Sequence, residues 1–290
     1  MKYYFTTLSN LNRVDIIKKI LPTFLYIGTE CNNNCIFCTE GGYRNDKSLK
    51  DIYKEFDKIK DKNSEINLMG KEPSISKDLF KILEYANQKG FTNLSMTSNG
   101  RMLSYIEFIR KLQCFNIRSF GITLVGHNSK LHDSLTRAEG SFEQTVNGLK
   151  NLKDLKIPFL INIVVLQQNK NYLENIVQFL LDYRPRNINF LFAIPGYDAM
   201  DKKTIPQMTE VIPIITKLIH KYKNLIIGSV GFPNCLMGKD ETYNVQCLEA
   251  SYNRTTKINI CNECKYDCGI FKSYIDIYGT DEFENVLPIK

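Results

Sequence analysis

Three cysteines stand close together near the start of the chain, in the segment YIGTECNNNCIFCTE. Cys31, Cys35 and Cys38 are separated by three residues and then by two, and no further cysteine or histidine follows closely. Structural zinc sites use four protein ligands, and catalytic zinc sites usually include histidine or carboxylate. A cubane [4Fe-4S] cluster has four iron corners, so three thiolates leave one iron open to another ligand. The spacing favours such a cluster; a zinc knuckle with a distant fourth ligand is the alternative.

A second group of cysteines occupies the last quarter of the chain. Its members are Cys235, Cys247, Cys261, Cys264 and Cys268. A C-x2-C pair with a third thiol close by predicts a metal site, because such close neighbours form disulfides poorly and intracellular thiols stay reduced. Zinc bound by four cysteines remains an alternative to a cluster here. The remaining cysteine, Cys114, lies in an apolar helical segment and is expected in the core.

The elements that position these cysteines alternate between short apolar runs and amphipathic stretches. The expected strands are residues 24–28, 65–69, 93–97, 119–125, 159–166 and 187–194. Between them, residues 173–181 repeat with the helical period, which predicts a helix that buries Leu173, Ile176, Val177, Leu180 and Leu181. The alternation predicts an α/β fold, a partial (β/α)6 TIM-like barrel.

Polar or small residues follow the expected strands, where a barrel of this type gathers its chemistry. The cysteine triplet follows the first strand, GKEPS the second and SNG the third, while the fourth ends at Thr123 and the fifth carries Asn162. From residue 231 the pattern changes to glycine, cysteine and short irregular stretches. We therefore predict a barrel domain over 1–230 and a small C-terminal module over 231–290.

The motif CNNNCIFC, with an aromatic residue before its last cysteine, resembles the defining motif of the radical S-adenosylmethionine (radical SAM) superfamily. The resemblance covers roughly residues 24–200. It implies that the amino and carboxylate groups of S-adenosylmethionine chelate the open iron, and that one electron from the cluster cleaves the cofactor to a 5'-deoxyadenosyl radical. That radical would take a hydrogen atom from a substrate, and Phe37 would line the adenine site.

Two further segments resemble cofactor-binding motifs of the same superfamily. NLMGKEPSI resembles its Gly-Gly-Glu-Pro segment, which implies that Gly70 and Glu72 bind the methionine amino group. Lys71 stands where the family has its second glycine, a residue that permits unusual backbone dihedrals, and its side chain is expected to turn away. MTSNGR resembles the Thr-Asn-Gly segment, which implies that Ser98 and Asn99 contact the cofactor.

The stretch ITLVGHNSKLHDSLTRAEGSFEQTVNGLKNL resembles a subgroup that includes molybdopterin-precursor cyclases and peptide-modifying maturases. The resemblance implies that Thr123 contacts the cofactor, that Arg137 pairs with its carboxylate, and that Asn162 binds its ribose. His127 and His132 are interpreted as surface residues.

The C-terminal run CNECKYDCGIFKSYIDIYG resembles a SPASM or twitch extension, which carries auxiliary iron–sulfur clusters. This implies one auxiliary [4Fe-4S] cluster held by Cys235, Cys261, Cys264 and Cys268. Cys247 has three possible roles: the fourth ligand in place of Cys235, a buried bystander, or a catalytic thiol that gives a hydrogen atom to the substrate radical. The auxiliary cluster would either pass an electron or bind the substrate directly.

Composition and charge narrow the expected partners. The net charge is +7, yet the lysines are spread along the chain, so a nucleic-acid substrate is disfavoured. No apolar run approaches the roughly 20 residues that span a bilayer, and a signal peptide is not evident, which predicts a cytoplasmic protein without a membrane partner. About twenty residues precede the first strand, fewer than a leader-binding domain needs, which favours a small-molecule substrate over a peptide.

A reducing partner such as a flavodoxin or ferredoxin is expected to supply the electron. Two other classes of function stay open: a non-enzymatic iron–sulfur electron carrier and a zinc-stabilised binding module. The polar residues at the strand ends disfavour the carrier, which would need no cofactor site.

Overall fold

The computed structural model describes residues 22–28, 30–39, 47–194, 201–238, 244–245, 255–263, 269–284 and 286–287. All statements on structure below concern these residues.

A parallel sheet forms the centre of the fold, with its strands side by side in chain order. The strands are β1 (Thr23–Gly28), β2 (Ile66–Gly70), β3 (Leu94–Ser98), β4 (Ile117–Thr123), β5 (Phe159–Val165), β6 (Asn187–Phe192), β7 (Ile226–Val230) and β8 (Asn244–Val245). The six strands expected from the sequence are all present. Within the described residues β1 and β8 are the two edges, so the sheet is an open, partial barrel.

The strand number exceeds the predicted six because β7 and the two-residue β8 extend the sheet. The β7 run IIGSV is short and contains glycine and serine, so it lacks the long apolar signature of β5. Pairing of β7 with β8 carries the sheet past residue 230. The boundary between a barrel domain and a module at residue 231 therefore remains a prediction.

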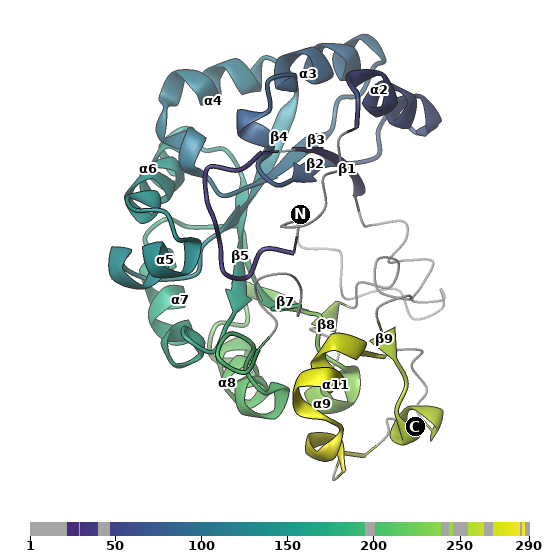
Figure 1. The fold of residues 1–290 in the computed structure, drawn as a ribbon. Helices are drawn as coiled ribbons and strands as arrows, with labels where there is room; N and C mark the ends of the chain where they lie inside the picture. Colours follow the sequence, from purple (N-terminus) through teal and green to yellow (C-terminus); the bar gives the residue numbers. More distant parts are fainter. Residues whose placement is uncertain are drawn as a thin grey trace.

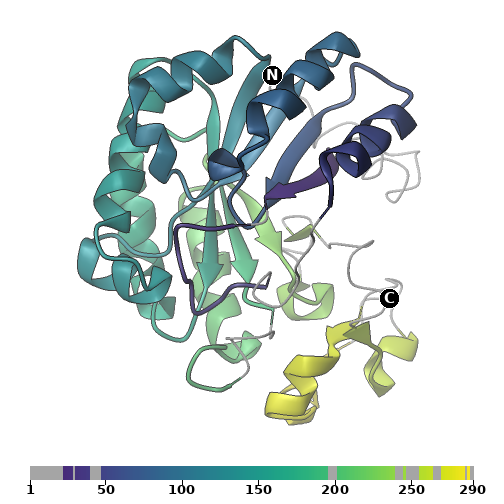
Figure 2. The same ribbon diagram turned by 45° about the horizontal axis from the view of Figure 1, so that its top comes forward.

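Helices cover the outer side of the curved sheet (Figures 1 and 2). They are α2 (Leu49–Lys58), α3 (Leu79–Gln88), α4 (Ile106–Gln113), α5 (Ser129–Thr136), α6 (Ser141–Asp154), α7 (Leu173–Leu181) and α8 (Met208–Lys221). In α7 four of the predicted core residues are fully buried, but Leu181 is 44% exposed, because it is the last residue of the helix.

Short 3-10 helices connect several of these elements. They are η1 (Pro73–Ile75), η2 (Arg101–Ser104), η3 (Lys170–Tyr172), η5 (Asn259–Glu263) and η6 (Asp281–Phe283). The C-terminal part also contains α9 (Asn234–Met237), α11 (Lys272–Tyr278) and the antiparallel pair β9 (Thr255–Thr256) and β10 (Ile270–Phe271).

Strand alternation divides the sheet into two faces. In β5 the side chains of Phe159, Ile161, Ile163 and Val165 are at most 3% exposed and join the core, while the residues between them are half-buried on the other face. Because successive side chains of a strand point to opposite faces, Asn162 lies on the inner side of the curve. The loop of residues 30–39, which we call the cysteine loop, also lies on that inner side (purple in Figure 1).

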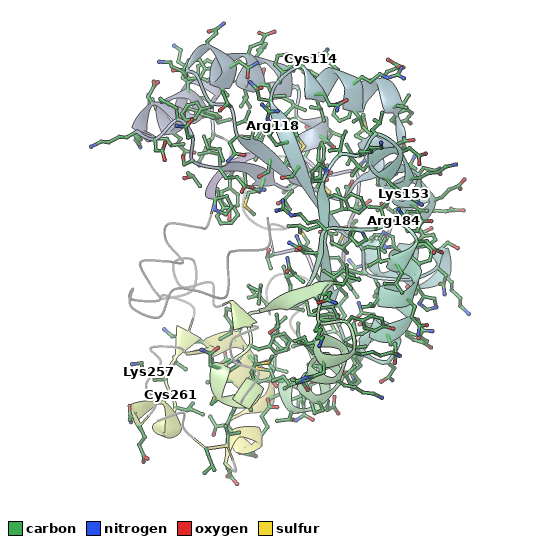
Figure 3. The ribbon with its side chains drawn as sticks, turned by 180° about the vertical axis from the view of Figure 1, so that it is seen from behind. Cys114, Arg118, Lys153, Arg184, Lys257 and Cys261 are labelled. Carbon is green, nitrogen blue, oxygen red and sulfur yellow. The ribbon has the colours of Figure 1, made fainter. Side chains whose placement is uncertain are left out.

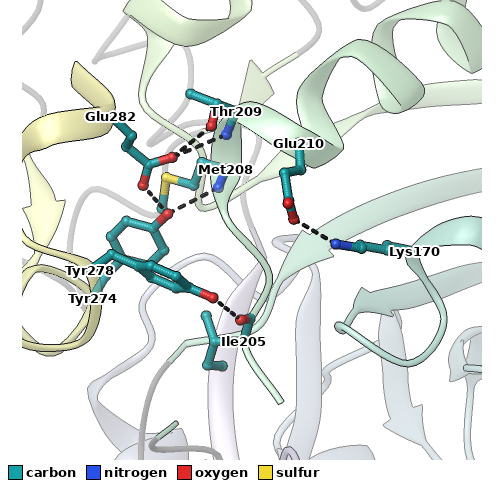
Figure 4. Close-up of polar contacts among 8 residues, drawn as sticks. All are labelled: Lys170, Ile205, Met208, Thr209, Glu210, Tyr274, Tyr278 and Glu282. Atoms are coloured by element: carbon teal, nitrogen blue, oxygen red, sulfur yellow. Dashed lines mark hydrogen bonds and ion pairs between the residues drawn. The ribbon is translucent and has the colours of Figure 1, made fainter. Parts of the chain in front are cut away.

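The C-terminal segment packs against the start of α8 (Figure 4). The Met208 N–H donates to the Tyr274 hydroxyl at 3.0 Å, and the Thr209 N–H donates to a Glu282 carboxylate oxygen at 3.2 Å. Tyr274 also donates to Glu282, and Tyr278 donates to a main-chain carbonyl before the helix. The first N–H groups of a helix lack partners within it. Tyr274 and Glu282, far along the sequence, accept hydrogen bonds from two of these groups in α8. No helix in the described parts of the chain is long and apolar enough to cross a membrane.

Candidate active site

The cysteine loop brings its three thiols together at the end of β1. Cys35 is half-buried, and its burial, followed by the charges of Cys31 and Cys38, raises its pKa to about 12. In a cubane each cysteine binds a different iron, so three neighbouring thiols can hold three corners of one cluster.

Gly28 at the end of β1 and Gly70 at the end of β2 approach each other closely just before the cysteine loop; we call this contact the glycine crossing. Gly70 has a φ of +126°, and a Cβ atom there would lie 2.7 Å from the Gly28 carbonyl oxygen. Beyond this crossing the Glu72 N–H donates to the Glu30 carbonyl at 2.9 Å. Lys71 is not among the residues with positive φ. The conformation that demands glycine therefore falls on Gly70, which is present, and the fold tolerates lysine at the next position.

The Glu72 carboxylate joins the ends of β2 and β3. It is 1% exposed and accepts hydrogen bonds from the Ser74 hydroxyl (2.5 Å), the Ser98 hydroxyl (2.8 Å) and the Asn99 N–H (2.7 Å). Burial raises its pKa, and the donated hydrogen bonds oppose that rise. The side chains of Glu72 and Ser98 therefore bind each other inside the fold instead of projecting from it.

The end of β3 in turn contacts the cysteine loop. The Asn99 amide donates to the Asn32 side-chain oxygen at 2.7 Å. Next to it, the Arg101 guanidinium donates to the Asn33 side-chain oxygen at 2.8 Å. Sequence reasoning missed Arg101; its only signal was its place directly after the SNG segment.

The end of α5 supports the loop from another side. The Asn34 N–H donates to the Thr136 carbonyl and the Ile36 N–H to the Leu135 carbonyl, each at 2.9 Å. These carbonyls belong to the last turn of a helix, where no helical N–H remains to bond them. Arg137 follows with a φ of +51° and ends the helix, which places this predicted cofactor residue next to the cysteine loop.

His132 is buried, so its interpretation as a surface residue is wrong. It is 1% exposed, and its Nδ1 accepts from the Val125 N–H at 3.3 Å. Burial lowers its pKa to about 4, which leaves the ring neutral at pH 7. A Cβ atom at Gly126 would lie 2.5 Å from the His132 nitrogen, so glycine there lets α5 approach closely. His127 is half-buried.

Two predicted cofactor residues are neighbours on the inner face of the sheet. Thr123 at the end of β4 pairs in register with Asn162 of β5. On the next strand, the Asn189 amide donates to the Asn162 side-chain oxygen at 3.3 Å. Asn189 was not predicted, although its position in the alternation of β6 matches that of Asn162 in β5. Phe37, in the cysteine loop, is half-buried and packs against the core.

Part of the C-terminal cysteine group lies within the described residues. Cys235 in α9 and Cys261 in η5 are both half-buried. Cys247, Cys264 and Cys268 lie outside the described residues. Cys114 is exposed at the end of α4, far from Cys261 (Figure 3). The prediction that Cys114 is a core residue is therefore wrong, since the helix ends there and its apolar side is formed by earlier residues.

These features define a class of protein: an open α/β barrel that presents a thiol-rich loop at the carboxyl end of its first strand. The donor set of the loop, three thiols supported on several sides, fits an iron–sulfur cluster. The Radical SAM superfamily model matches residues 25–180 of the 290, and the chain belongs to that superfamily. Membership implies a [4Fe-4S] cluster and S-adenosylmethionine as cofactors.

The chain is also similar to curated proteins named probable GTP 3',8-cyclase. The protein of Methanocaldococcus jannaschii is 26% identical over 173 residues, which cover 57% of this chain and 56% of the relative. One from Saccharolobus islandicus is 28% identical over 195 residues, covering 65% and 62%. This chain thus matches little more than half the length of these relatives.

Among solved structures, the fold is similar to Streptococcus suis SuiB bound to S-adenosylmethionine. The TM-score is 0.56 at 17% identity, and the match covers 77% of this chain and 54% of SuiB. At this identity the similarity establishes the shared fold.

Proposed function

We propose that the chain is a radical SAM enzyme that abstracts a hydrogen atom from a small-molecule or peptide substrate. The observation that carries the proposal is the cysteine loop, whose thiols lie together on a segment that is hydrogen-bonded to residues following β2 and β3 and to the end of α5. The cluster and S-adenosylmethionine, when bound, supply the 5'-deoxyadenosyl radical. The chain supplies the position of both cofactors.

Cys31, Cys35 and Cys38 are the proposed iron ligands. Because each would bind its own iron, the fourth iron stays open for S-adenosylmethionine. Cluster binding must displace the thiol protons, because cysteine binds iron as the thiolate.

The remaining predicted cofactor residues divide into two kinds. Thr123 and Asn162 have half-buried side chains on the inner face, so we assign them direct contacts, together with Arg137 and Phe37 of the neighbouring segments. The Gly70 backbone and the polar side chains after β2 and β3 form the other kind. The side chains of Glu72, Ser98 and Asn99 bind one another or the cysteine loop, so we assign them the role of shaping the cofactor site.

The substrate class rests on two similarities. The curated relatives carry the name of a reaction on GTP, which makes a nucleotide the first small molecule to test. SuiB has also been solved with a precursor peptide, but that similarity concerns the fold alone. The sequence similarity therefore favours a small molecule.

We further propose that Cys235, Cys261, Cys264 and Cys268 hold an auxiliary [4Fe-4S] cluster in a twitch-like module over residues 231–290. Two observations support the placement of the module: the half-burial of Cys235 and Cys261, and the contacts of α11 and η6 with α8. Cys247 is kept as an alternative ligand or hydrogen-atom donor, and a flavodoxin or ferredoxin as the reductant.

Anaerobic reconstitution with iron and sulfide, followed by dithionite and S-adenosylmethionine, tests the function. We expect 5'-deoxyadenosine and methionine from the wild type, none from Cys35→Ala, and wild-type amounts from Cys114→Ala. Adding GTP should increase turnover if the substrate is a nucleotide. A wild-type protein that holds its full iron and sulfide but forms no 5'-deoxyadenosine contradicts the proposal.

A further inference from the structure

The guanidinium of Arg101 connects three separate segments. Its Nη1 donates to the main-chain carbonyl of Asn32 and, at 2.8 Å, to the side-chain oxygen of Asn33. Its Nε donates to the Gln144 side-chain oxygen of α6 at 2.6 Å. One side chain that leaves the end of β3 thus holds the cysteine loop and α6 together.

The carbonyl that Arg101 holds belongs to the peptide unit between Asn32 and Asn33. The N–H of that same unit points at the Cys31 sulfur, with a nitrogen–sulfur distance of 3.4 Å. A peptide unit is planar, so fixing its carbonyl also fixes the direction of its N–H. A guanidinium on the carbonyl oxygen also polarises the unit, which strengthens the N–H as a donor.

The backbone from which the Arg101 side chain projects is also fixed by hydrogen bonds. The Arg101 N–H donates to the Asn99 side-chain oxygen at 3.0 Å, and the Asn99 carbonyl accepts from the Thr145 hydroxyl of α6 at 2.9 Å. Asn99 then reaches the Asn32 side chain, so its two amide atoms connect the backbone of Arg101 with the loop. The Arg101 side chain is partly buried, so water screens its charge less than on an open surface.

We propose that Arg101 is a positioning residue that holds the Asn32–Asn33 peptide with its N–H toward Cys31 and thereby raises the reduction potential of the cluster bound there. Hydrogen bonds to cysteine sulfur and nearby positive charge both stabilise the reduced cluster, which carries one more negative charge than the oxidised one. The inference rests on the proposed function in one respect, that the cysteine loop holds a cluster.

An EPR-monitored redox titration of the reconstituted protein tests the proposal. The signal followed is the one that Cys35→Ala removes, measured without S-adenosylmethionine. We expect Arg101→Gln to lower the midpoint potential, because the charge is lost and the peptide is released. Arg101→Lys keeps the charge but cannot contact Asn32, Asn33 and Gln144 together, so its potential should fall by a smaller amount.

Arg110→Gln is the matched control. Arg110 lies on α4, its side chain is 57% exposed, and it pairs with Glu107 three residues earlier. Its replacement should leave the midpoint potential unchanged. Iron content, sulfide content and thermal unfolding are measured on every variant. If Arg101 only supported the fold, its replacement would change these three quantities and leave the midpoint potential of the assembled cluster unaltered.

A wild-type potential in Arg101→Gln with full iron and sulfide overturns the proposal. If that variant assembles no cluster, the titration is made on Arg101→Lys, and an unchanged potential there has the same consequence. The proposed function is tested by a separate measurement, the formation of 5'-deoxyadenosine. A wild type that forms no 5'-deoxyadenosine leaves the titration possible, because the titration needs only the cluster.

Discussion

The cysteine loop and the described C-terminal residues, which include Cys235 and Cys261, contact the rest of the fold in different ways. The cysteine loop is bonded at nearly every second residue, through Glu30, Asn32, Asn33, Asn34 and Ile36, to elements that surround it. The described C-terminal residues contact the barrel through the pairing of β8 with β7 and through aromatic packing on Phe192. Hydrogen bonds from α11 and η6 to the start of α8 and the residues before it add to these contacts.

The difference indicates two ways to build a metal site. The cysteine loop is hydrogen-bonded to the scaffold on several sides, which suits a reactive cluster with one open iron, because its partner must be placed accurately. The proposed second site would belong to a segment that packs against the barrel. Its four expected thiols could complete their own coordination, so metal binding can itself supply much of its local order.

Removing one thiol from each group gives the largest expected effect. If both groups hold [4Fe-4S] clusters, the wild type binds about eight irons per chain, and Cys35→Ala and Cys261→Ala each bind about four. Cys35→Ala should form no 5'-deoxyadenosine, whereas Cys261→Ala should still form it. Iron analysis and chromatography of the products measure both. Equal loss of 5'-deoxyadenosine in the two variants would remove the functional difference between the groups.

The second-largest effect is expected from a substitution at Gly70, where the glycine crossing lies before the cysteine loop. Gly70→Ala places a Cβ atom against the Gly28 backbone at a positive φ, so the free energy of unfolding should fall by about 3 kcal/mol or more. Gly90→Ala is the control: its φ is +82°, but nothing lies within 4 Å of the new Cβ, and the expected loss is about 1–2 kcal/mol. Urea unfolding compares them, and equal losses would show that the crossing is not tight.

The support of the loop by α5 should depend on pH through His132. Its pKa is about 4 in the fold against 6.5 in the unfolded chain, so between these values the unfolded chain binds more protons. Stability should therefore fall as the pH drops from 6.5 to 4, by at most about 3 kcal/mol from this residue. The facing charges act in opposite directions, with Asp133 raising this pKa and Arg101 lowering it.

His132→Asn isolates this contribution, because the asparagine oxygen can accept from the Val125 N–H and does not titrate. Urea unfolding from pH 7 to pH 4 should show a shallower loss of stability in the variant. The same pH dependence in both proteins would contradict the assignment.

The docking of the C-terminal segment gives the smallest effect. Glu282→Ala removes the acceptor for the Thr209 N–H and hydroxyl, so unfolding should become easier by about 1–2 kcal/mol. Glu284→Ala, at an exposed neighbouring position, should change stability by less than about 0.5 kcal/mol. Formation of 5'-deoxyadenosine should stay at the wild-type level in both. Its loss in Glu282→Ala alone would show that the two regions are coupled.

Local patterns in the sequence predicted β1 to β6 and the place of the cysteine loop after β1, since both follow from neighbouring residues. The network around the cysteine loop could not be predicted, because Arg101 meets Asn32 and Asn33 only after the chain folds β1 beside β2 and β3. The same holds for the burial of His132, which depends on the close approach that Gly126 allows. The pairing of Thr123 with Asn162 follows from the parallel register, which sequence alone does not give.

EPR spectroscopy of the reduced protein, before and after adding S-adenosylmethionine, tests most directly that the first cysteine group holds the reactive cluster. In Cys261→Ala, we expect the cofactor to change the spectrum, because the open iron of the cysteine loop remains. In Cys35→Ala, the cofactor should leave the spectrum of the remaining cluster unchanged. A cofactor-dependent change in Cys35→Ala, or none in Cys261→Ala, would contradict the account.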